Sequence, residues 1–285
     1  MPNVSTRLFA DDTNIFLFDR SCHNLIAKGF ETLSQLSHWF DANKLTLHLG
    51  KTNYTIFHSR EMAHPCYDHF VFRDAQISKT SSTRYLGLII DDKLNWVAHI
   101  SDLCNSLIKY TGIFYHLRGT FPKATAIQVY YSFIYSKLRY AIEIYGTAKR
   151  SFLKQLHTLH NRLIKALTGK PRRYPTKLLY KEYNLLMLSE IHTYCMCSFV
   201  YNYRKNILPQ AISDAVCPHL VSSNRIITRN NAFFNVTRHN SYHGKLLLNN
   251  YCFSLWQSLP ISITNAVSLR SFQSKLKMYF LNMYY

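Results

Sequence analysis

Hydrophobic and polar positions along the chain follow two different periods, and the change falls near residue 97. Before it, short apolar runs separated by polar turns are typical of strands. The expected strands are 4–9, 13–18, 45–49, 54–58, 69–72 and 85–91. Between the second and the third strand, Asn24 is a suitable N-cap, and apolar residues at helical spacing predict one helix that ends at 41–44.

From residue 97 onward, apolar residues recur every three or four positions, which is the period of amphipathic helices. The expected helices lie near 100–117, 127–138, 152–167, 176–184, 189–204 and 269–283. The segment GKPRRYP at 169–175 interrupts the pattern, because its glycine and prolines disfavour a continuous helix. Residues 205–250 show no clear period and are expected to be mostly loop.

These patterns together predict an α+β chain with a β-rich first part and a helical second part. We expect a division at about 1–96, 97–205 and 206–285. The chain has 285 residues, of which 47% are hydrophobic, so it can bury a substantial core and is not expected to be disordered.

Charge is distributed very unevenly between the two parts. Residues 103–285 contain 24 Lys and Arg but only four acidic residues, whereas residues 1–102 are nearly balanced. A segment of this charge repels itself unless an anion is near, and nucleic acid is the first candidate partner. A membrane surface is the second candidate, and an inert basic surface is the third reading.

The sequence shows no sign of export or of membrane insertion. The N-terminal segment MPNVSTRLFADD lacks the apolar core of a signal peptide, and no apolar run reaches the roughly 18 residues of a membrane span. The seven cysteines are odd in number and irregularly spaced, which does not indicate a disulfide framework. We therefore expect an intracellular protein, in the nucleus or the cytoplasm, without a membrane partner.

Two adjacent carboxylates, Asp11 and Asp12, lie between the first two expected strands. Aspartate is common in turns because its side chain bonds nearby backbone amides, so a structural role is one reading of the pair. The other reading is a metal site, since Mg²⁺ prefers hard oxygen ligands and a tight turn holds them rigidly. The pair by itself leaves both readings open.

The segment from Phe9 to Asp12 resembles the catalytic box of reverse transcriptases, in which an aromatic residue and Ala precede two Asp. Further segments resemble, in order, the blocks of the non-LTR retrotransposon type found in LINE- and jockey-like elements. They are WFDANKLTLHLGKTNYTIF (39–57), STRYLGLIIDDKLNW (82–96), YYSFIYSKLRYAIEIYG (130–146), LHNRLIKALTG (159–169) and SLWQSLP (254–260). The chain thus resembles the C-terminal part of such an enzyme over nearly its whole length.

The resemblance implies an RNA-directed DNA polymerase that uses two Mg²⁺ (or Mn²⁺) ions, an RNA template, a DNA primer and deoxynucleoside triphosphates. It places Asp11 on the metal-binding carboxylate of the box and Asp12 on its weaker companion. Phe9 and Ala10 fall on positions that shape the floor beneath nucleotide and primer. Lys51 falls on a lysine proposed to protonate the departing pyrophosphate, with a solvated loop lysine as the alternative.

The same resemblance assigns Tyr85, Leu86 and Gly87 to the primer grip, a strand that positions the primer end. The alternative is plain core packing, which suits Leu86 better than Gly87. The fold implied is a partial palm, made of the hairpin, a helix and short antiparallel strands. An all-α basic thumb and a mostly irregular tail with a closing amphipathic helix complete it.

A thumb holds the template–primer duplex through phosphate contacts that do not read sequence. The basic residues expected to make these contacts are Arg162, Lys165, Arg172 and Arg173. Arg172 and Arg173 are the sharpest pair, because they lie in a proline-flanked loop and shield no apolar helix face.

In the family, a second metal-binding carboxylate and the fingers lie well upstream of the box. The acids Asp19, Asp91 and Asp92 do not match that position. We therefore expect this chain to be inactive as a polymerase by itself. The alternative function is that of a non-catalytic nucleic-acid-binding remnant that acts through its basic helical part.

Overall fold

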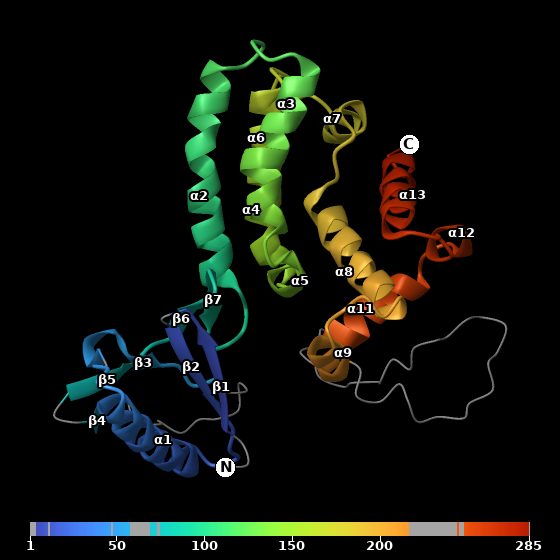
Figure 1. Cartoon of the computed structure of the whole chain (residues 1–285). Coiled ribbons are helices and arrows are strands. Elements are labelled where there is room, and N and C mark those ends of the chain that lie inside the picture. Colours follow the sequence, from blue (N-terminus) through green and yellow to red (C-terminus); the bar gives the residue numbers. More distant parts are fainter. Residues whose placement is uncertain are drawn as a thin grey trace, which may run out of the picture. The chain divides into compact units, whose positions relative to one another are not determined.

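Strands and one long helix make up the first part of the chain, and helices make up the rest (Figure 1). The structure, a computed structural model, describes residues 4–10, 12–46, 48–57, 69–72, 75–216, 244 and 248–284. It divides into two compact units, Met1–Leu94 and Asn95–Tyr285. The predicted mixture of α and β structure, with small antiparallel sheets, is confirmed.

The first unit holds short strands and the helix α1 (Cys22–Ala42). The strands are β1 (Val4–Phe9), β2 (Asp12–Leu17), β3 (Asn53–Tyr54), β4 (His69–Phe72), β5 (Ala75–Lys79), β6 (Ser82–Tyr85) and β7 (Leu88–Asp91). Strands β1 and β2 form one antiparallel hairpin, and β6 and β7 form another. Strand β5 pairs antiparallel with β4 and parallel with β3.

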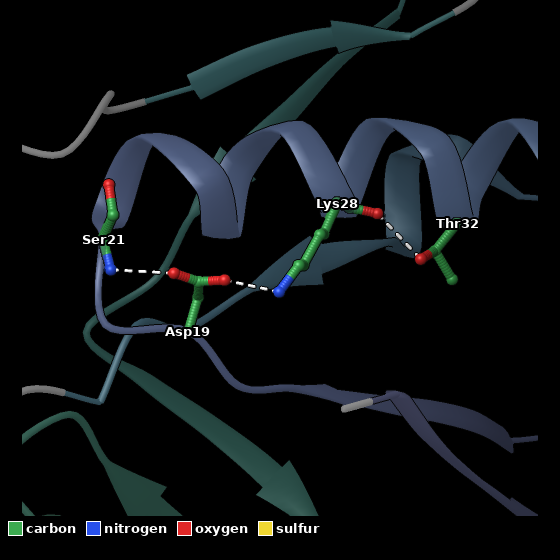
Figure 2. A network of polar contacts seen from close by, with 4 residues as sticks. All are labelled: Asp19, Ser21, Lys28 and Thr32. Atoms are coloured by element: carbon green, nitrogen blue, oxygen red, sulfur yellow. Dashed lines mark hydrogen bonds and ion pairs between the residues drawn. The ribbon is translucent and has the colours of Figure 1, made fainter. Parts of the chain in front are cut away.

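Helix α1 begins at an ion pair rather than at the predicted cap, because its N-cap is Ser21 and not Asn24. The Asp19 carboxylate accepts a hydrogen bond of 2.9 Å from the Ser21 backbone amide and a second one from the Lys28 ammonium (Figure 2). One turn further on, the Thr32 hydroxyl donates to the Lys28 carbonyl at 2.7 Å. Asp19 therefore joins the end of β2 to the first turns of α1.

The strand predicted at 45–49 is wrong. Helix α1 ends in a Schellman turn, in which Lys44 has a φ of 54° and the Leu45 amide donates to the Phe40 carbonyl at 2.8 Å. A short 3₁₀ helix, η1 (Leu49–Lys51), follows, and β3 is shorter than the strand predicted at 54–58. The end of α1 therefore determines the backbone conformation at 45–49, where the alternation of apolar and polar side chains alone favoured a strand.

Only the second half of the strand predicted at 85–91 is one continuous strand, β7, because the chain reverses at Leu86 and Gly87. Leu86 and Gly87 have φ values of 47° and 80°, and Tyr85 pairs with Leu88. Positive φ at both central residues is the type I′ geometry of two-residue hairpins. Gly87 is therefore one of the two turn residues, and the apolar Leu86 beside it gave no sign of a turn in the sequence.

The second unit is helical, and most of the predicted helices are present. They are α2 (Val97–His116), α3 (Lys123–Val129), the π-helix η2 (Tyr130–Tyr135), α4 (Ser136–Arg139), α5 (Ile142–Tyr145), α6 (Arg150–Leu167), α7 (Thr176–Tyr183), α8 (Leu188–Arg204), α9 (Gln210–Val216), α11 (Leu248–Gln257), α12 (Ile261–Thr264) and α13 (Leu269–Asn282). Helix α9 and the start of α11 fall within the predicted loop 205–250, and residues 217–243 and 245–247 of that prediction lie outside the described residues. Within the described residues, no helix is long and apolar enough to cross a membrane.

The core of the second unit lies between α2 and α6 and between α8 and its neighbours α11 and α13. Ile100 and Leu107 of α2 and Leu156 and Leu163 of α6 are fully buried, as their helical spacing predicts. Burial of each such side chain contributes about 1.5–3 kcal/mol. The two helices are therefore held together mainly by the hydrophobic effect.

A buried polar network joins α6 to η2 and α7. His160 is fully buried, and its ring nitrogens lie 3.1 Å from the Tyr130 hydroxyl and 3.0 Å from the Tyr180 hydroxyl. The Tyr180 hydroxyl donates its proton to the Asn161 Oδ1 at 2.8 Å, so it accepts from His160 Nδ1. His160 Nε2 then accepts from Tyr130, and burial lowers the pKa of His160 to about 3.

Candidate functional site

The β1–β2 hairpin presents a carboxylate at the end of a tight turn. The last pair of its register joins Phe9 to Asp12, which leaves two residues between the strands. Ala10 has a φ of 48°, the left-handed conformation that two-residue hairpin loops require. Asp11 lies outside the described residues. Asp12 is the first residue of β2 and is exposed.

One face of this hairpin carries two of the predicted site residues, Phe9 and Asp12. Residues two apart on a strand point to the same side, so Asp12, Asn14 and Phe16 share a face. Directly paired residues also share a face, so Phe9 lies beside Asp12. Phe9 is 61% exposed, which leaves an open aromatic surface next to the carboxylate.

The opposite face of the hairpin packs on α1. A Cβ at Gly29 of α1 would lie 3.8 Å from Cδ1 of Leu17, so helix and strand approach closely there. Leu17 is an odd-numbered position and points away from the face of Asp12 and Phe16. Helix α1 and the Asp19–Lys28 pair thus hold the hairpin and leave its Asp12 face free of the helix.

The β6–β7 hairpin meets the Asp12 face through an aromatic contact. The ring of Tyr85 lies edge-on against Phe16, with centroids 5.9 Å apart and an interplanar angle of 85°. Phe16 is four residues from Asp12, which is roughly 13 Å along a strand. Tyr85 therefore shares the face with the carboxylate but lies well away from the turn.

Leu86 and Gly87 form the turn beside Tyr85. Leu86 is 39% exposed, so it is not a core residue and the packing alternative does not describe it. A left-handed conformation at a residue with a branched side chain is unfavourable by about 1–2 kcal/mol. The structure places these two residues in a turn and leaves their role as a primer grip a prediction.

Lys51 ends the 3₁₀ helix η1, which packs against β5. Its backbone amide donates to the His48 carbonyl at 3.0 Å, and the residue is exposed. Both of its readings, a proton donor and a solvated lysine, require an exposed side chain. Its predicted role remains a prediction.

Asp91 is held through its carboxylate and Asp92 through its backbone. Asp91 is buried, and its Oδ1 accepts from the Lys93 amide at 3.2 Å. The Asp92 amide donates to the Ser81 carbonyl at 2.9 Å and closes the β6–β7 hairpin at its base. Within the part of the chain that the structure describes, no three His, Cys, Asp or Glu gather as a metal-binding group.

The basic residues predicted from sequence differ in what they do. Lys165 is half-buried, and its ammonium donates to the Arg172 carbonyl at 2.8 Å. It therefore anchors the loop that follows α6. Arg162, Arg172 and Arg173 are exposed and can reach a partner.

Sequence reasoning missed the second anchor of this loop. Lys170 forms an ion pair of 2.9 Å with Glu182 of α7, and the Tyr174 hydroxyl donates to the same carboxylate at 3.0 Å. Hydrogen bonding to Lys170 lowers the pKa of Glu182, and Glu182 raises that of Lys170. Glu182 is one of only four acids after residue 102, and that scarcity was the available signal.

Comparisons with known proteins give a consistent set of relatives. The chain is 22% identical over 166 residues to a probable RNA-directed DNA polymerase from transposon X-element of Drosophila melanogaster, a match that covers 56% of this chain and 18% of that protein. It is 24% identical over 186 residues to a probable RNA-directed DNA polymerase from transposon BS of the same species, covering 64% of this chain and 20% of the relative.

A third relative is the RNA-directed DNA polymerase from mobile element jockey of Drosophila funebris, 29% identical over 98 residues, with 33% of this chain and 11% of the relative covered. The matches thus span about a fifth or less of the length of these curated relatives. No family model and no solved structure matches the chain. The chain is therefore similar to a part of the RNA-directed DNA polymerases of non-LTR retrotransposons such as jockey.

Proposed function

We propose that this chain is the part of a retrotransposon RNA-directed DNA polymerase that carries one side of its metal site. The observation that supports this most strongly is the β1–β2 hairpin, which ends in a two-residue loop and presents the exposed Asp12 beside the exposed Phe9. The relatives are named as polymerases of this class. Together they favour nucleotidyl transfer over a purely structural turn.

The environment of Asp12 fits a divalent cation. Its carboxylate makes no hydrogen bond or ion pair with any residue that the structure describes, in contrast to Asp19 and Asp91. An exposed, unpaired carboxylate on a rigid hairpin is a ligand that Mg²⁺ accepts. Asp11 and Asp12 would hold the metal. When bound, two such ions stabilise the attacking and leaving oxygens of a phosphoryl transfer.

The other residues of the first unit would position nucleic acid around these carboxylates. Phe9 and Ala10 would form the floor beneath the primer end, and the Tyr85–Phe16 contact would hold the β6–β7 turn on the same face of the hairpin. Lys51 would donate a proton to the departing pyrophosphate. In this proposal 1–96 is a partial palm, 97–205 the thumb and 206–285 the tail.

A further carboxylate must complete the site. The carboxylates of Asp19 and Asp91 are bonded to the start of α1 and to the turn after β7, and Asp92 follows that hairpin, where the resemblance places no metal ligand. We therefore place the missing ligand outside the described residues. RNA template, DNA primer and deoxynucleoside triphosphates would be the partners of the assembled enzyme.

A chimeric polymerase tests the proposal. Residues 1–96 would replace the corresponding segment of the Drosophila funebris jockey polymerase, and primer extension on an RNA template would be measured with Mg²⁺. We expect extension that falls by at least a hundredfold with Asp11→Asn and with Asp12→Asn, since a lost metal ligand or electrostatic contact commonly costs that much. The exposed Asp41→Asn serves as the control. A folded chimera whose extension is unchanged by both box variants would contradict the proposal.

A second candidate function is nucleic-acid binding without catalysis. It is favoured by the excess of 24 Lys and Arg over four acids after residue 102 and by the exposure of Arg172 and Arg173. This function predicts salt-dependent binding that is the same in the wild-type chain and in Asp11→Asn. Binding that requires the box would argue against it.

A further inference from the structure

A small pocket lies within the second unit, where the C-terminal end of α8 meets α11 and the segment between α12 and α13. Its volume is about 240 Å³. The residues that line it include Tyr201, Arg204, Lys205, Trp256, Thr264 and Asn265. Figure 1 shows α11 at this end of α8. The pocket is therefore built from the tail of the chain and lies in a different unit from the Asp12 hairpin.

Three stacked aromatic rings hold the walls of the pocket in place. The ring centroid of the fully buried Phe272 of α13 lies 4.8 Å from that of Tyr201 and 5.3 Å from that of Trp256. The Tyr201 hydroxyl donates to the Ala266 carbonyl at 3.0 Å, which fixes the segment after α12. The pocket is thus formed before any ligand binds, and a preformed site loses less entropy on binding.

Two cations of α8 lie at this pocket against its aromatic walls. The Arg204 guanidinium lies 5.3 Å from the ring centroid of Trp256, and the Lys205 ammonium lies 5.9 Å from that of Tyr201. These are cation–π distances, which restrict the side chains. Lys205 is exposed, so its ammonium donors can reach a ligand. The fork of an arginine matches the two oxygens of a carboxylate.

Acidic side chains are distant from these cations. Among the described residues that line the pocket none is acidic, and the sequence contains no Asp or Glu after Asp214. The Asp214 carboxylate accepts from Gln210 at 2.7 Å. Glu190 is bonded to Tyr284 and lies roughly 21 Å from Arg204 along α8. The pocket is therefore positively charged, and an anionic group from outside the tail is the ligand that fits it.

Exposed aliphatic side chains adjoin the lining residues. Ile261 and Val267, which flank the segment 264–266, are 64% and 91% exposed, and Ile207, just after Lys205, is 60% exposed. Such side chains contribute little to the core, and when they gather beside a charged pocket they indicate an interaction surface. A small inorganic anion would leave them in water. A peptide with aliphatic residues beside a carboxylate would cover them.

We propose that this site, here called the tail pocket, binds an acidic side chain of a separate partner protein, presented by a segment in which Asp or Glu adjoins aliphatic residues. The carboxylate would accept from Lys205 and Arg204, and the aliphatic neighbours would cover Ile261 and Val267. The charge of the pocket selects the carboxylate, and its apolar surroundings select a peptide. The site does not depend on the proposed polymerase function.

Fluorine NMR of the full chain labelled with 5-fluorotryptophan tests the site. The chain has three tryptophans, so the signal of Trp256 can be assigned with single Trp→Phe variants. The probe is the peptide amide Gly-Ser-Ile-Glu-Val-Ser-Gly, titrated to millimolar concentration, and its matched control has Gln in place of Glu. We expect the Glu peptide to shift the Trp256 signal with at least about tenfold higher affinity, since a charge-assisted hydrogen bond is worth that much.

Equal affinities of the two peptides would overturn the proposal. A Trp256 signal that the Glu peptide leaves unchanged in the folded chain would overturn it as well. Signals of Trp39 and Trp96 should stay in place, because neither residue lines the pocket.

Variants at exposed positions locate the binding without disturbing the core. Lys205→Gln should weaken the Glu peptide about tenfold, and Ile261→Ser/Val267→Ser should weaken it to a similar extent. The matched control Lys149→Gln removes the same charge at the exposed N-cap of α6 and should leave the affinity unchanged. Equal losses in Lys205→Gln and Lys149→Gln would show that net charge carries binding, and this would overturn the proposal.

Three further measurements test the class of the occupant. Inorganic phosphate or a single-stranded oligonucleotide that shifts the Trp256 signal at a lower concentration than the Glu peptide would overturn the assignment to a protein partner. Sedimentation of the chain alone tests whether a second copy fills the pocket. Self-association that Lys205→Gln abolishes would make the occupant another copy of this chain and would overturn the proposal of a separate partner.

Discussion

At the scale of single residues, three aspartates of the first unit, Asp12, Asp19 and Asp91, differ in their surroundings. Asp19 is bonded to Lys28 and to the Ser21 amide, which lowers its pKa, and Asp91 is buried and bonded to the Lys93 amide. Asp12 is exposed and unpaired within the described residues. Asp19 and Asp91 therefore stabilise the local structure, whereas the carboxylate of Asp12 is available as a ligand.

The sequence alone could identify the Asp11–Asp12 pair as a candidate site. An aromatic residue and Ala precede the pair, and the segments that follow it resemble the blocks of the same family in order. The sequence could not assign Asp19, whose partner Lys28 is nine residues away across a strand end and a helix start. It also could not place Tyr85 on Phe16, since the contact joins two hairpins about 70 residues apart. Contacts of this kind depend on tertiary packing and leave no local signal.

Gly146 gives a test of packing at a single residue. Its φ is −64°, so no special backbone conformation is required, but a Cβ would lie 2.5 Å from the Ile142 carbonyl and 2.6 Å from Cδ2 of the buried His192. We expect Gly146→Ala to lower the free energy of unfolding by about 1–3 kcal/mol, measured by urea denaturation.

Gly112→Ala is the control for this change. Nothing lies within 4 Å of its added Cβ, and the residue is inside α2. Alanine is the better helix former, so this variant should gain about 0.5–1 kcal/mol. Equal effects of the two substitutions would contradict the packing seen around His192.

At the scale of elements, periodicity predicted most of the helices and the β1–β2 hairpin. It failed where a turn was made of apolar residues, as at Leu86, and where the end of α1 fixed the following backbone, as at Lys44 and Leu45. Both failures have one cause. A left-handed residue other than glycine reverses the chain without any signal in hydrophobicity.

The π-helix η2 interrupts the helix from Lys123 to Arg139 and carries Tyr130 into the core. Tyr130 is 1% exposed and bonds His160. π-helical turns are frequent at functional sites. Here the π-helical turn contains Tyr130, whose hydroxyl joins η2 to α6.

The buried histidines make the helical unit sensitive to acid. Burial lowers the pKa of His160 to about 3 and that of His192 to about 4, whereas both bind a proton near pH 6.5 once unfolded. The unfolded state therefore binds more protons below pH 6.5, and the stability present above that pH is lost as the pH falls toward 4. Glu190, whose pKa is raised by burial, acts in the opposite direction.

Thermal unfolding followed by circular dichroism from pH 7 to pH 4 measures this dependence. We expect a loss on the order of a few kcal/mol, and a shallower dependence in His160→Gln, even though that variant is less stable at pH 7. His116→Gln, an exposed change at the end of α2, should keep the wild-type dependence. An equally steep loss in His160→Gln would show that His160 does not carry the effect.

At the scale of the whole chain, two chemistries lie in two separate units. The first unit holds the β1–β2 hairpin with the exposed Asp12, and the second holds most of the positive charge. An enzyme that copies nucleic acid needs both, a metal site for the reaction and a basic surface for the duplex. The relatives, of which the matches cover about a fifth or less, are named as RNA-directed DNA polymerases.

Metal-directed cleavage tests the central claim most directly, because it needs no polymerase activity. Fe²⁺ replaces Mg²⁺ at a carboxylate site and, with ascorbate and peroxide, cuts the backbone nearby. For the chimera that carries residues 1–96 we predict cuts within a few residues of Asp12, suppressed by excess Mg²⁺ and absent in its Asp11→Asn/Asp12→Asn variant, while Asp19→Asn keeps them. Cuts at the hairpin that persist in the double variant, or no cuts there in the folded chimera, would contradict the account.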